Sequence, residues 1–533
     1  MASVCPKHSR CPLNPGPEKK HQTDVAQFLF QPCPIKGDFA VYRIIFTARG
    51  LPTRKSLARR VLRTIAISCF LALLLVGFAC PQASADVGVV LNESLDSSVD
   101  RITGTGHSAV YFSRICPDSP VKLRLCGPGE HGSVMSNYIN ISEDQSFEWN
   151  VAPLNVYLYG VEDIENRPIF ASYKVKHVLE ERYRTKYLSA LCAGDPCRNS
   201  YKSEWREMVA ATLIRSVYIF VVDTTEEQDR KFMAEFNGAP NENHFNGVTR
   251  NCADFTRRVI NTYFPNATRP DYLNDFGMTS PKAIARSFTR YARKHPESNL
   301  RVLHFAQVPG TIKRSREVRA GTEQLYHSKK FLIPMLIFAD EAVPVVAASY
   351  LLTGHFNPGH EFEHRPAVEI VSTRGSQSEP ASPEQRTFIV GTSKEWKAYR
   401  KAFDSMVAED IQNDVIDERG DLKHFFKEFD EAGTPSIDEN GLLWMETSVN
   451  GEPARVGLSA RNVLARDSDP QLAHQFLLTR ISHVLKSPKH SREPMFEFVQ
   501  DWANLKQASE KHAMTLARNA SPEKPPKTTA RPD

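Results

Sequence analysis

The stretch Asn251–Phe255 constrains this chain most, because it sets a cysteine, Cys252, at a predicted helix start. Apolar residues then recur at three- and four-residue spacing, which predicts a helix with one apolar face. A thiol in a first helical turn faces backbone N–H groups and the positive end of the helix dipole, and both favour thiolate. We therefore expect a nucleophile with a depressed pKa at Cys252, although a small buried cysteine packed under a helix is the simpler alternative. The recurring apolar residues are Phe255, Val259, Ile260 and Tyr263.

The first 85 residues resemble a targeting leader. A basic flank from Arg54 to Arg63 precedes an apolar run from Ile65 to Ala79 and then Ala83-Ser84-Ala85, which is the order of a secretory signal. The run is short for a membrane span of ~20 residues. We expect cleavage near Ala85 and a periplasmic or other extracytoplasmic mature chain; an uncleaved signal anchor is the alternative. The polar stretch in front indicates a long amino-terminal region or a translation start downstream of Met1.

Length and charge narrow the class of protein. A chain of 533 residues suggests two or three domains, and a content of 41% hydrophobic and 24% charged residues fits ordinary globular domains. The net charge of +5 is not concentrated in a Lys/Arg run. We therefore expect no nucleic-acid partner.

Cysteine usage leaves one thiol over. Five of the ten cysteines precede residue 86. In an oxidising compartment disulfides persist, and two pairs lie close in sequence across turns, Cys116–Cys126 and Cys192–Cys197. Their pairing would leave Cys252 free, and an odd thiol in an exported protein calls for a role. Sequence alone does not fix this connectivity.

Strands and helices are mixed between residues 100 and 310, which indicates an α+β domain. Alternating apolar patterns predict three early strands, and the residues from about 160 to 215 look helical. Thr224 with Glu227 fits a capping box for a later helix. The predicted strands are 107–115, 121–126, 133–141 and 217–222, and the clearest helical segments are 174–191 and 203–214.

Three short elements together resemble a known superfamily. Gly106-His107 heads one strand, Asn137-Tyr138 lies on a later one, and Asn251-Cys252-Ala253-Asp254-Phe255 opens a helix, with Phe245-Asn246 just before it. This order resembles the circularly permuted papain-like fold of NlpC-type proteins, and most closely the Lnb N-terminal periplasmic domain family. The resemblance covers roughly residues 100 to 310 and implies a permuted papain-like domain with a helical insertion.

The resemblance implies a catalytic dyad of Cys252 and His107. A neutral imidazole can take the thiol proton and return it to the leaving group. A third polar group usually orients the imidazole, and by motif position we assign this role to Asn137. Alternatives are Glu130, His131 and Asn140. No cofactor or metal is implied.

The implied reaction is thiolate attack and acyl-enzyme formation on an amide or peptide of the cell envelope. A lipid acyltransferase or thioesterase of the same fold is an alternative, because an apolar segment that tends toward membranes follows the domain. Another alternative is a non-catalytic envelope scaffold that uses the same fold for binding.

A rival motif lies downstream at His360-Glu361-Phe362-Glu363-His364. The spacing matches H-E-x-x-H, which on a helix places two histidines around zinc. Pro358-Gly359 before it and Pro366 after it leave little room for that helix. A turn with solvated histidines is the interpretation we prefer.

The remaining chain divides by composition. After a domain at 86–330, the apolar segment 331–355 would be long enough to span a bilayer, but Asp340, Glu341 and two prolines oppose a simple span. Three alternatives are open: a broken or membrane-associated helical hairpin, a buried soluble helix and a true span. A linker is expected at 356–386, a small α+β accessory domain at 387–515, with amphipathic helices at 396–411 and 470–484 and a hairpin at 442–458, and a disordered tail at 516–533.

Overall fold

The computed structural model describes most of the chain from Ala85 onward. Residues 1–84 of the predicted leader, Cys192, Cys197 and residues 521–533 of the predicted tail lie outside the described residues. Residues 516–520, predicted to belong to a disordered tail, are instead helical. The described residues all belong to one compact unit. The described residues are 85–95, 106–137, 139–142, 145–191, 204–242, 246, 249–327, 329–338, 341–353, 356–363, 369–372, 384–387, 392–412, 422–449, 451–486 and 495–520.

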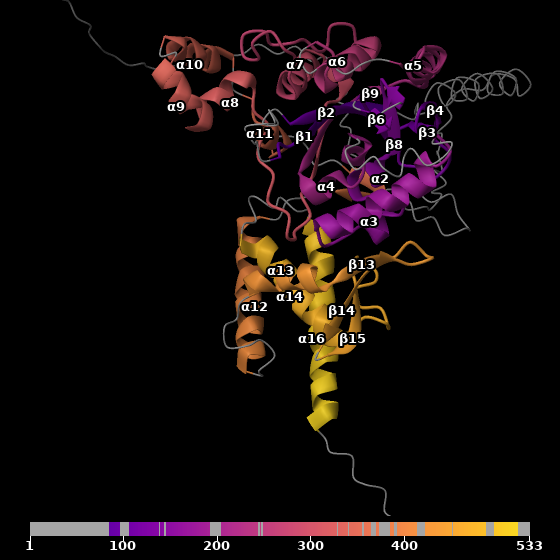
Figure 1. Ribbon diagram of the computed structural model, residues 1–533, viewed down its shortest axis with the longest axis vertical. Helices are drawn as coiled ribbons and strands as arrows, with labels where there is room; N and C mark the ends of the chain where they lie inside the picture. Colours follow the sequence, from indigo (N-terminus) through magenta and orange to yellow (C-terminus); the bar gives the residue numbers. More distant parts are fainter. Residues whose placement is uncertain are drawn as a thin grey trace, which may run out of the picture. The chain divides into compact units, whose positions relative to one another are not determined.

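A six-stranded antiparallel sheet forms the centre of the fold (Figure 1). Its strand order is β10-β9-β1-β2-β5-β8, so the first two strands in the chain lie in the middle. The pairing register places Asn92, the last residue of β1, opposite His107 of β2 and Val217 of β9. The end of β1 therefore lies beside the starts of β2 and β9. The strands are β1 (Ala85–Asn92), β2 (His107–Phe112), β5 (Ser133–Ser136), β8 (Asn150–Pro153), β9 (Val217–Thr224) and β10 (Arg301–Phe305).

Helices cover both faces of this sheet (Figure 1). Successive side chains of a strand point to opposite faces. Val110 and Phe112 of β2 accordingly pack in the cluster with α5 (Glu226–Gly238), α6 (Cys252–Tyr263) and α7 (Pro281–Lys294). Ala109 and Tyr111 pack in the other cluster, with α2 (Leu154–Tyr159), α3 (Tyr173–Tyr183) and α4 (Ala211–Ile214). The chain is therefore mixed α+β, as predicted.

Of two predictions for the early strands, the disulfide is confirmed and the long strand 133–141 is wrong. The disulfide Cys116–Cys126 is present and links β3 (Ile115–Ser119) to β4 (Lys122–Leu125), as predicted. The predicted strand 133–141 is instead two strands, β5 and β6 (Ile139–Ser142), and β6 pairs with β7 (Gln145–Phe147). Asn137 lies at the break between them, not on a strand.

Both predicted helical segments are helical, but each is divided into two helical elements of different type. The segment 174–191 contains α3 and a π-helical turn, η2 (Arg184–Leu188), and 203–214 contains η4 (Glu204–Met208) and α4. The helix α5 has a capping box, but Thr225 and Gln228 form it. The prediction of Thr224 and Glu227 was wrong by one residue, because the last strand residue, Thr224, still pairs with Ala85.

The apolar segment after residue 330 is broken into two helices. α8 (Gly321–His327) leads into α9 (Lys329–Phe338), and α10 (Ala342–Thr353) follows. None of the described helices is long and apolar enough to cross a membrane. Many of the apolar side chains described here are exposed, which differs from the alternative of a buried helix. The break into two helices agrees with the hairpin alternative, and association with a membrane stays a prediction.

The chain from Glu369 on builds a second set of elements. β11 (Glu369–Ser372) and β12 (Glu384–Thr387) pair within the segment predicted to be a linker. A three-stranded sheet contains the predicted hairpin as β14 and β15. The elements are α12 (Ser393–Gln412), α13 (Leu422–Ala432), β13 (Thr434–Ile437), β14 (Leu443–Val449), β15 (Glu452–Gly457), α14 (Pro470–Lys486) and α16 (Met495–Ala520).

These later elements share a core with the central domain. The ring of Phe170 lies 5.0 Å from that of Phe426 and 6.0 Å from that of Phe476. Lys174 Nζ donates to the carbonyl oxygens at the end of α13, where a cation complements the helix dipole. The contact area is therefore part of the hydrophobic core.

A buried ion pair should decide the stability of this junction. Arg480 donates to Asp501 at 2.7 Å and to the carbonyl of Ile169 at 2.9 Å, and both charged side chains are buried. Asp501→Ala leaves a buried guanidinium without its anion, so we expect a loss of about 3–5 kcal/mol in the free energy of unfolding. Denaturant unfolding curves measure it. Asp467→Ala, in the exposed pair with Arg455, is the control and should cost no more than about 1 kcal/mol; equal losses would contradict the assignment.

Candidate active site

Cys252 is the first residue of α6, as the sequence predicts. The Asn251 side-chain oxygen accepts the N–H groups of Ala253 at 2.9 Å and Asp254 at 3.0 Å, and Asp254 completes the capping box. The other end of the same amide donates to the carbonyl of Thr279, just before α7. Asn251 therefore ties the start of α6 to the start of α7. The predicted apolar face of α6 is buried against β1 and β2.

The thiol itself is buried against β2. Only 8% of Cys252 is exposed. Burial raises its pKa, and hydrogen bonds from the backbone and hydroxyl of Ser108 and the backbone of Ala253 oppose this increase. The expected depression of the thiol pKa was wrong, because desolvation of a charged sulfur outweighs the helix terminus. The resting group is a neutral thiol, and Cys252 forms no disulfide.

His107 opens β2, directly after Gly106. Gly106 has φ of +69°, and a Cβ there would overlap the carbonyl oxygen of Asn92, so only glycine fits. The imidazole Nε2 lies 2.8 Å from Ser136 Oγ. Burial lowers the pKa of His107 to about 4. The nearby carboxylate of Glu207 raises this pKa, and the charge of Arg215 lowers it further. The ring is therefore neutral at pH 7.

Ser136, not Asn137, contacts the imidazole. Asn137 Nδ2 donates to the carbonyl of Glu148 at 2.7 Å, and its Oδ1 is buried without a partner in the described part of the chain. The register explains the difference, because Ser136 is the last β5 residue and shares a sheet face with His107. Asn137 follows the strand end. Of the alternatives, Glu130 binds Arg124 at 2.6 Å in the disulfide hairpin, His131 is half-buried in the loop before β5, and Asn140 lies in β6.

The thiol and the imidazole lie near the same end of β2, but their contacts are on different faces of the sheet: Cys252 bonds Ser108, and His107 bonds Ser136. Ser108 bonds Thr256 of α6 and lies on the face of α6, whereas His107 starts on the face of α2. A half-buried carboxylate couples the two, because Glu207 of η4 interacts electrostatically with both His107 and Cys252. Tyr157 of α2, which accepts a 2.6 Å hydrogen bond from Asn92, also interacts electrostatically with Cys252.

Glu207 stays ionised despite its surroundings. Burial would raise its pKa, but the paired guanidinium of Arg215, together with His107 and Lys176, holds the pKa of Glu207 at about 2. An anion fixed beside a neutral imidazole stabilises that imidazole when it gains a proton. Sequence reasoning missed Glu207, Ser136 and Ser108. Only Ser108 had a sequence signal: it follows His107 in a predicted strand, where successive side chains point to opposite faces.

Neither metal candidate offers a free ligand set. The H-E-x-x-H stretch forms only a six-residue helix, α11 (Pro358–Glu363), and Glu361 is buried in an ion pair with Arg293. His364 lies outside the described residues. Cys116, Cys126 and Glu130 cluster closely, but the two sulfurs are bonded to each other and Glu130 binds Arg124.

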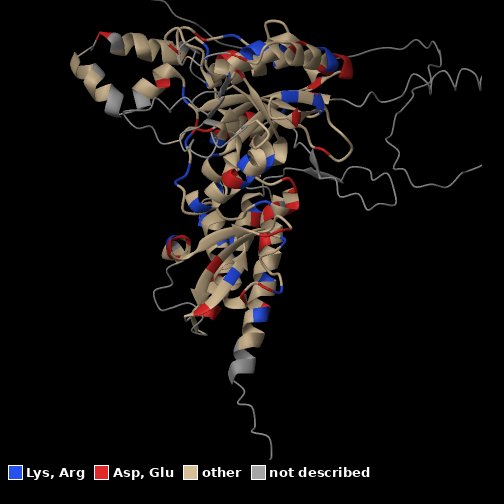
Figure 2. Ribbon diagram, turned by 45° about the vertical axis from the view of Figure 1, so that its right-hand side comes forward, with Lys and Arg blue, Asp and Glu red and all other residues tan. Residues whose placement is uncertain are grey.

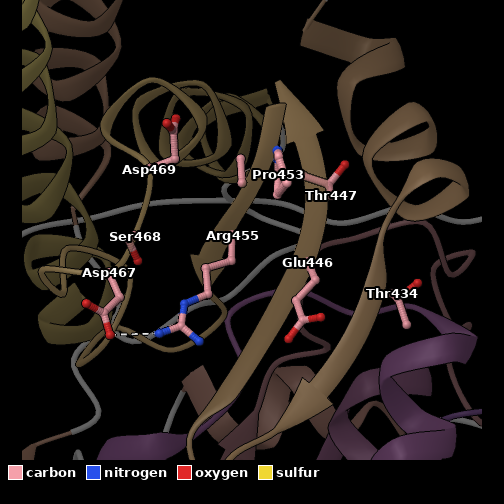
Figure 3. Close-up of a pocket in the computed structure, with 9 residues that line it drawn as sticks. Thr434, Glu446, Thr447, Pro453, Arg455, Asp467, Ser468 and Asp469 are labelled. Atoms are coloured by element: carbon pink, nitrogen blue, oxygen red, sulfur yellow. Dashed lines mark hydrogen bonds and ion pairs between the residues drawn. The ribbon is translucent and has the colours of Figure 1, made fainter. Parts of the chain in front are cut away.

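Neither Cys252 nor His107 lines either of two pockets in the described part of the chain. One, of about 690 Å³, opens over β14 and β15, where Arg455 pairs with Asp467 (Figure 3). The other, of about 500 Å³, lies where Tyr218 and His304 meet the segment 314–319, which we call the strap, and Tyr350 of α10. Val318 of the strap packs beside Gly106, so this second pocket adjoins the start of β2.

No protein-family model, curated protein or solved structure matches this chain. The resemblance to permuted papain-like proteins therefore remains a prediction.

The thiol assignment predicts an alkylation profile. Cys252 should titrate above the usual range of a free cysteine, because burial raises its pKa. Ser108→Ala should raise the midpoint further, since it removes a hydrogen bond that favours thiolate. Rates of iodoacetamide modification against pH, scaled to each variant's plateau and read by peptide mass, measure the midpoint.

His107→Ala serves as the control in that series. The imidazole is uncharged above a pH of about 4, so its removal should leave the thiol midpoint nearly unchanged. A midpoint below the usual cysteine value that rises in His107→Ala would instead establish an imidazolium–thiolate pair and refute the neutral resting state.

Proposed function

We propose that this protein is an exported cysteine-dependent acyl-transfer enzyme, with Cys252 as nucleophile and His107 as general base. The observation that supports the proposal is that a capped helix-terminal thiol and a buried imidazole lie near the same end of β2, and that both interact electrostatically with Glu207. The papain-like resemblance supports the same pair. An amide or peptide of the cell envelope is the leading substrate class.

The reaction follows from the neutral resting state. His107 takes the proton from Cys252 Sγ as the sulfur attacks the substrate carbonyl, and Glu207 stabilises the imidazolium that forms. The imidazolium then gives its proton to the leaving nitrogen, and a thioester to Cys252 results. Water, deprotonated by His107, or another acceptor releases the acyl group and restores the thiol. Ser136 positions the ring through Nε2 and is a positioning residue, not a catalytic one.

A lipid ester is the second candidate substrate. The observation that favours it is the exposed apolar surface of α9 and α10, near the pocket that adjoins β2. In this version Cys252 Sγ attacks the ester carbonyl carbon of the lipid, the C–O bond breaks, the alcohol leaves with the proton from His107, and the fatty acyl group forms the thioester. A binding scaffold without chemistry is the contrasting class of function.

Variants should separate these roles. Cys252→Ala should abolish thioester formation, and His107→Ala should slow it by roughly a hundredfold or more, the usual scale for a lost proton shuttle. The assay is intact-protein mass after exposure to an activated ester, an envelope peptide amide or phospholipid vesicles. If the protein is folded and Cys252 remains unmodified with all three substrates, a binding scaffold is the better description.

Ser136 and Asn137 form a matched pair of neighbours. Ser136→Ala should lower the rate and shift its pH profile, and Ser136→Thr should restore both, because a hydroxyl orients the imidazole. Asn137→Ala should leave the pH profile unchanged. The reverse pattern would return the orienting role to Asn137. His360→Ala and a zinc chelator should have no effect, since Glu361 already pairs with Arg293.

Export makes a separate prediction. The mature chain should begin near Asp86, because the basic, apolar, Ala-x-Ala order ends there. Amino-terminal sequencing of envelope fractions tests it. Recovery of peptides from residues 1–60 in the mature protein would contradict cleavage. The Cys116–Cys126 disulfide is compatible with an oxidising compartment.

A further inference from the structure

Exposed large apolar side chains gather in one region of the described chain. Most of them come from two segments, the loop at 272–276 between α6 and α7, and the hairpin of α9 and α10. Phe338 is 85% exposed, Ile337 66% and Leu351 67%, so water would cover most of each side chain. Contiguous exposed apolar surface on this scale marks an interaction site. The residues are Tyr272, Leu273, Phe276, Ile333, Leu336, Ile337, Phe338, Val345 and Leu351.

Buried polar contacts join the loop to the helices. Asn274 accepts hydrogen bonds from Thr322 of α8 at 2.9 Å and from Ser349 of α10 at 3.4 Å. Asp275 accepts the N–H of Gly321 at the start of α8. The apolar side chains of the loop therefore stand on a fixed scaffold next to the hairpin. We call these two segments together the apolar platform.

The two helices have no charged face. After Lys330, α9 contains only apolar residues and one proline, and α10 contains no charged residue (Figure 2). At ~100° per residue, the exposed side chains of α9 cover an arc of roughly 200°. A helix that is apolar around most of its circumference suits a lipid environment, whereas a protein partner covers a single stripe.

A basic segment leads directly into these helices. Residues 310–338 contain six Lys or Arg and two Glu, a net charge of +4. Lys313, Arg314 and Arg316 are exposed, and the pocket lined by Arg316 also contains Tyr350 of α10. Positive charge beside an apolar surface complements anionic lipid headgroups.

We infer that the apolar platform docks on the surface of an anionic bilayer. By length, α9 and α10 reach only ~15 and ~18 Å, about half of the ~30 Å hydrocarbon core. Exposed Glu341 at the turn between them keeps that turn at headgroup level, so the helices lie in the plane of the interface. Tyr272 and Phe276 enter the same interface, where aromatic rings are favoured. This binding requires no chemistry at Cys252.

Vesicle flotation of the full chain tests the docking. We expect the protein to float with vesicles of phosphatidylcholine plus phosphatidylglycerol. The combined change Ile337→Ser, Phe338→Ser and Leu351→Ser should raise the lipid concentration for half-maximal binding roughly tenfold or more, because it removes buried apolar area. Lys313→Gln with Arg316→Gln should weaken binding only to the anionic vesicles and only at low salt.

A matched triple variant controls for general surface polarity. Ile411→Ser, Val499→Ser and Met514→Ser change exposed apolar side chains of α12 and α16, away from the platform, and should leave flotation unchanged. Equal weakening of flotation by both triple variants would overturn the inference. Flotation that neither triple variant changes would also overturn it and would assign lipid binding to the leader. A dimer in lipid-free solution that the platform triple dissociates, with no flotation, would identify a second copy as the occupant.

Discussion

Burial of the central sheet on both faces is the constraint on which the candidate site depends. Because helices cover β2 on either side, its first two residues carry their polar groups into dry surroundings. A dry site favours the neutral forms of both His107 and Cys252. The helix terminus behind Cys252 is present, yet it does not outweigh desolvation. The same burial keeps water from the thiol, so in the proposed reaction charge would appear only when a substrate is bound.

The local parts of this arrangement could be read from sequence. Asn251 as a cap, the apolar spacing of α6, the Gly-His start of β2 and the Cys116–Cys126 pair all depend on residues within one element or one turn. Such signals are strong because the backbone itself sets the spacing. The α+β class followed from the same patterns.

The non-local parts could not be read in this way. Ser136 replaces Asn137 beside the imidazole because β5 ends one residue before Asn137, and strand ends are set by pairing with β2 and β8. Glu207 reaches the site from a 3-10 helix about a hundred residues from His107, and nothing in its own sequence neighbourhood indicates that. The shared core with α13 and α14 was missed for a related reason, since composition marks a boundary but not what packs across it.

A neutral pair changes what the surroundings must do. In an imidazolium–thiolate enzyme the charges exist before the substrate arrives, whereas in the reaction we propose proton transfer creates them inside the protein. Glu207 is held ionised by Arg215 and interacts with the imidazole, so it lowers the free energy of the protonated ring. It also interacts with the sulfur, where its charge raises the pKa and disfavours an unproductive thiolate. In the proposed reaction, one fixed carboxylate would therefore favour proton transfer to His107 at the step when the sulfur becomes bonded to carbon and no longer carries charge.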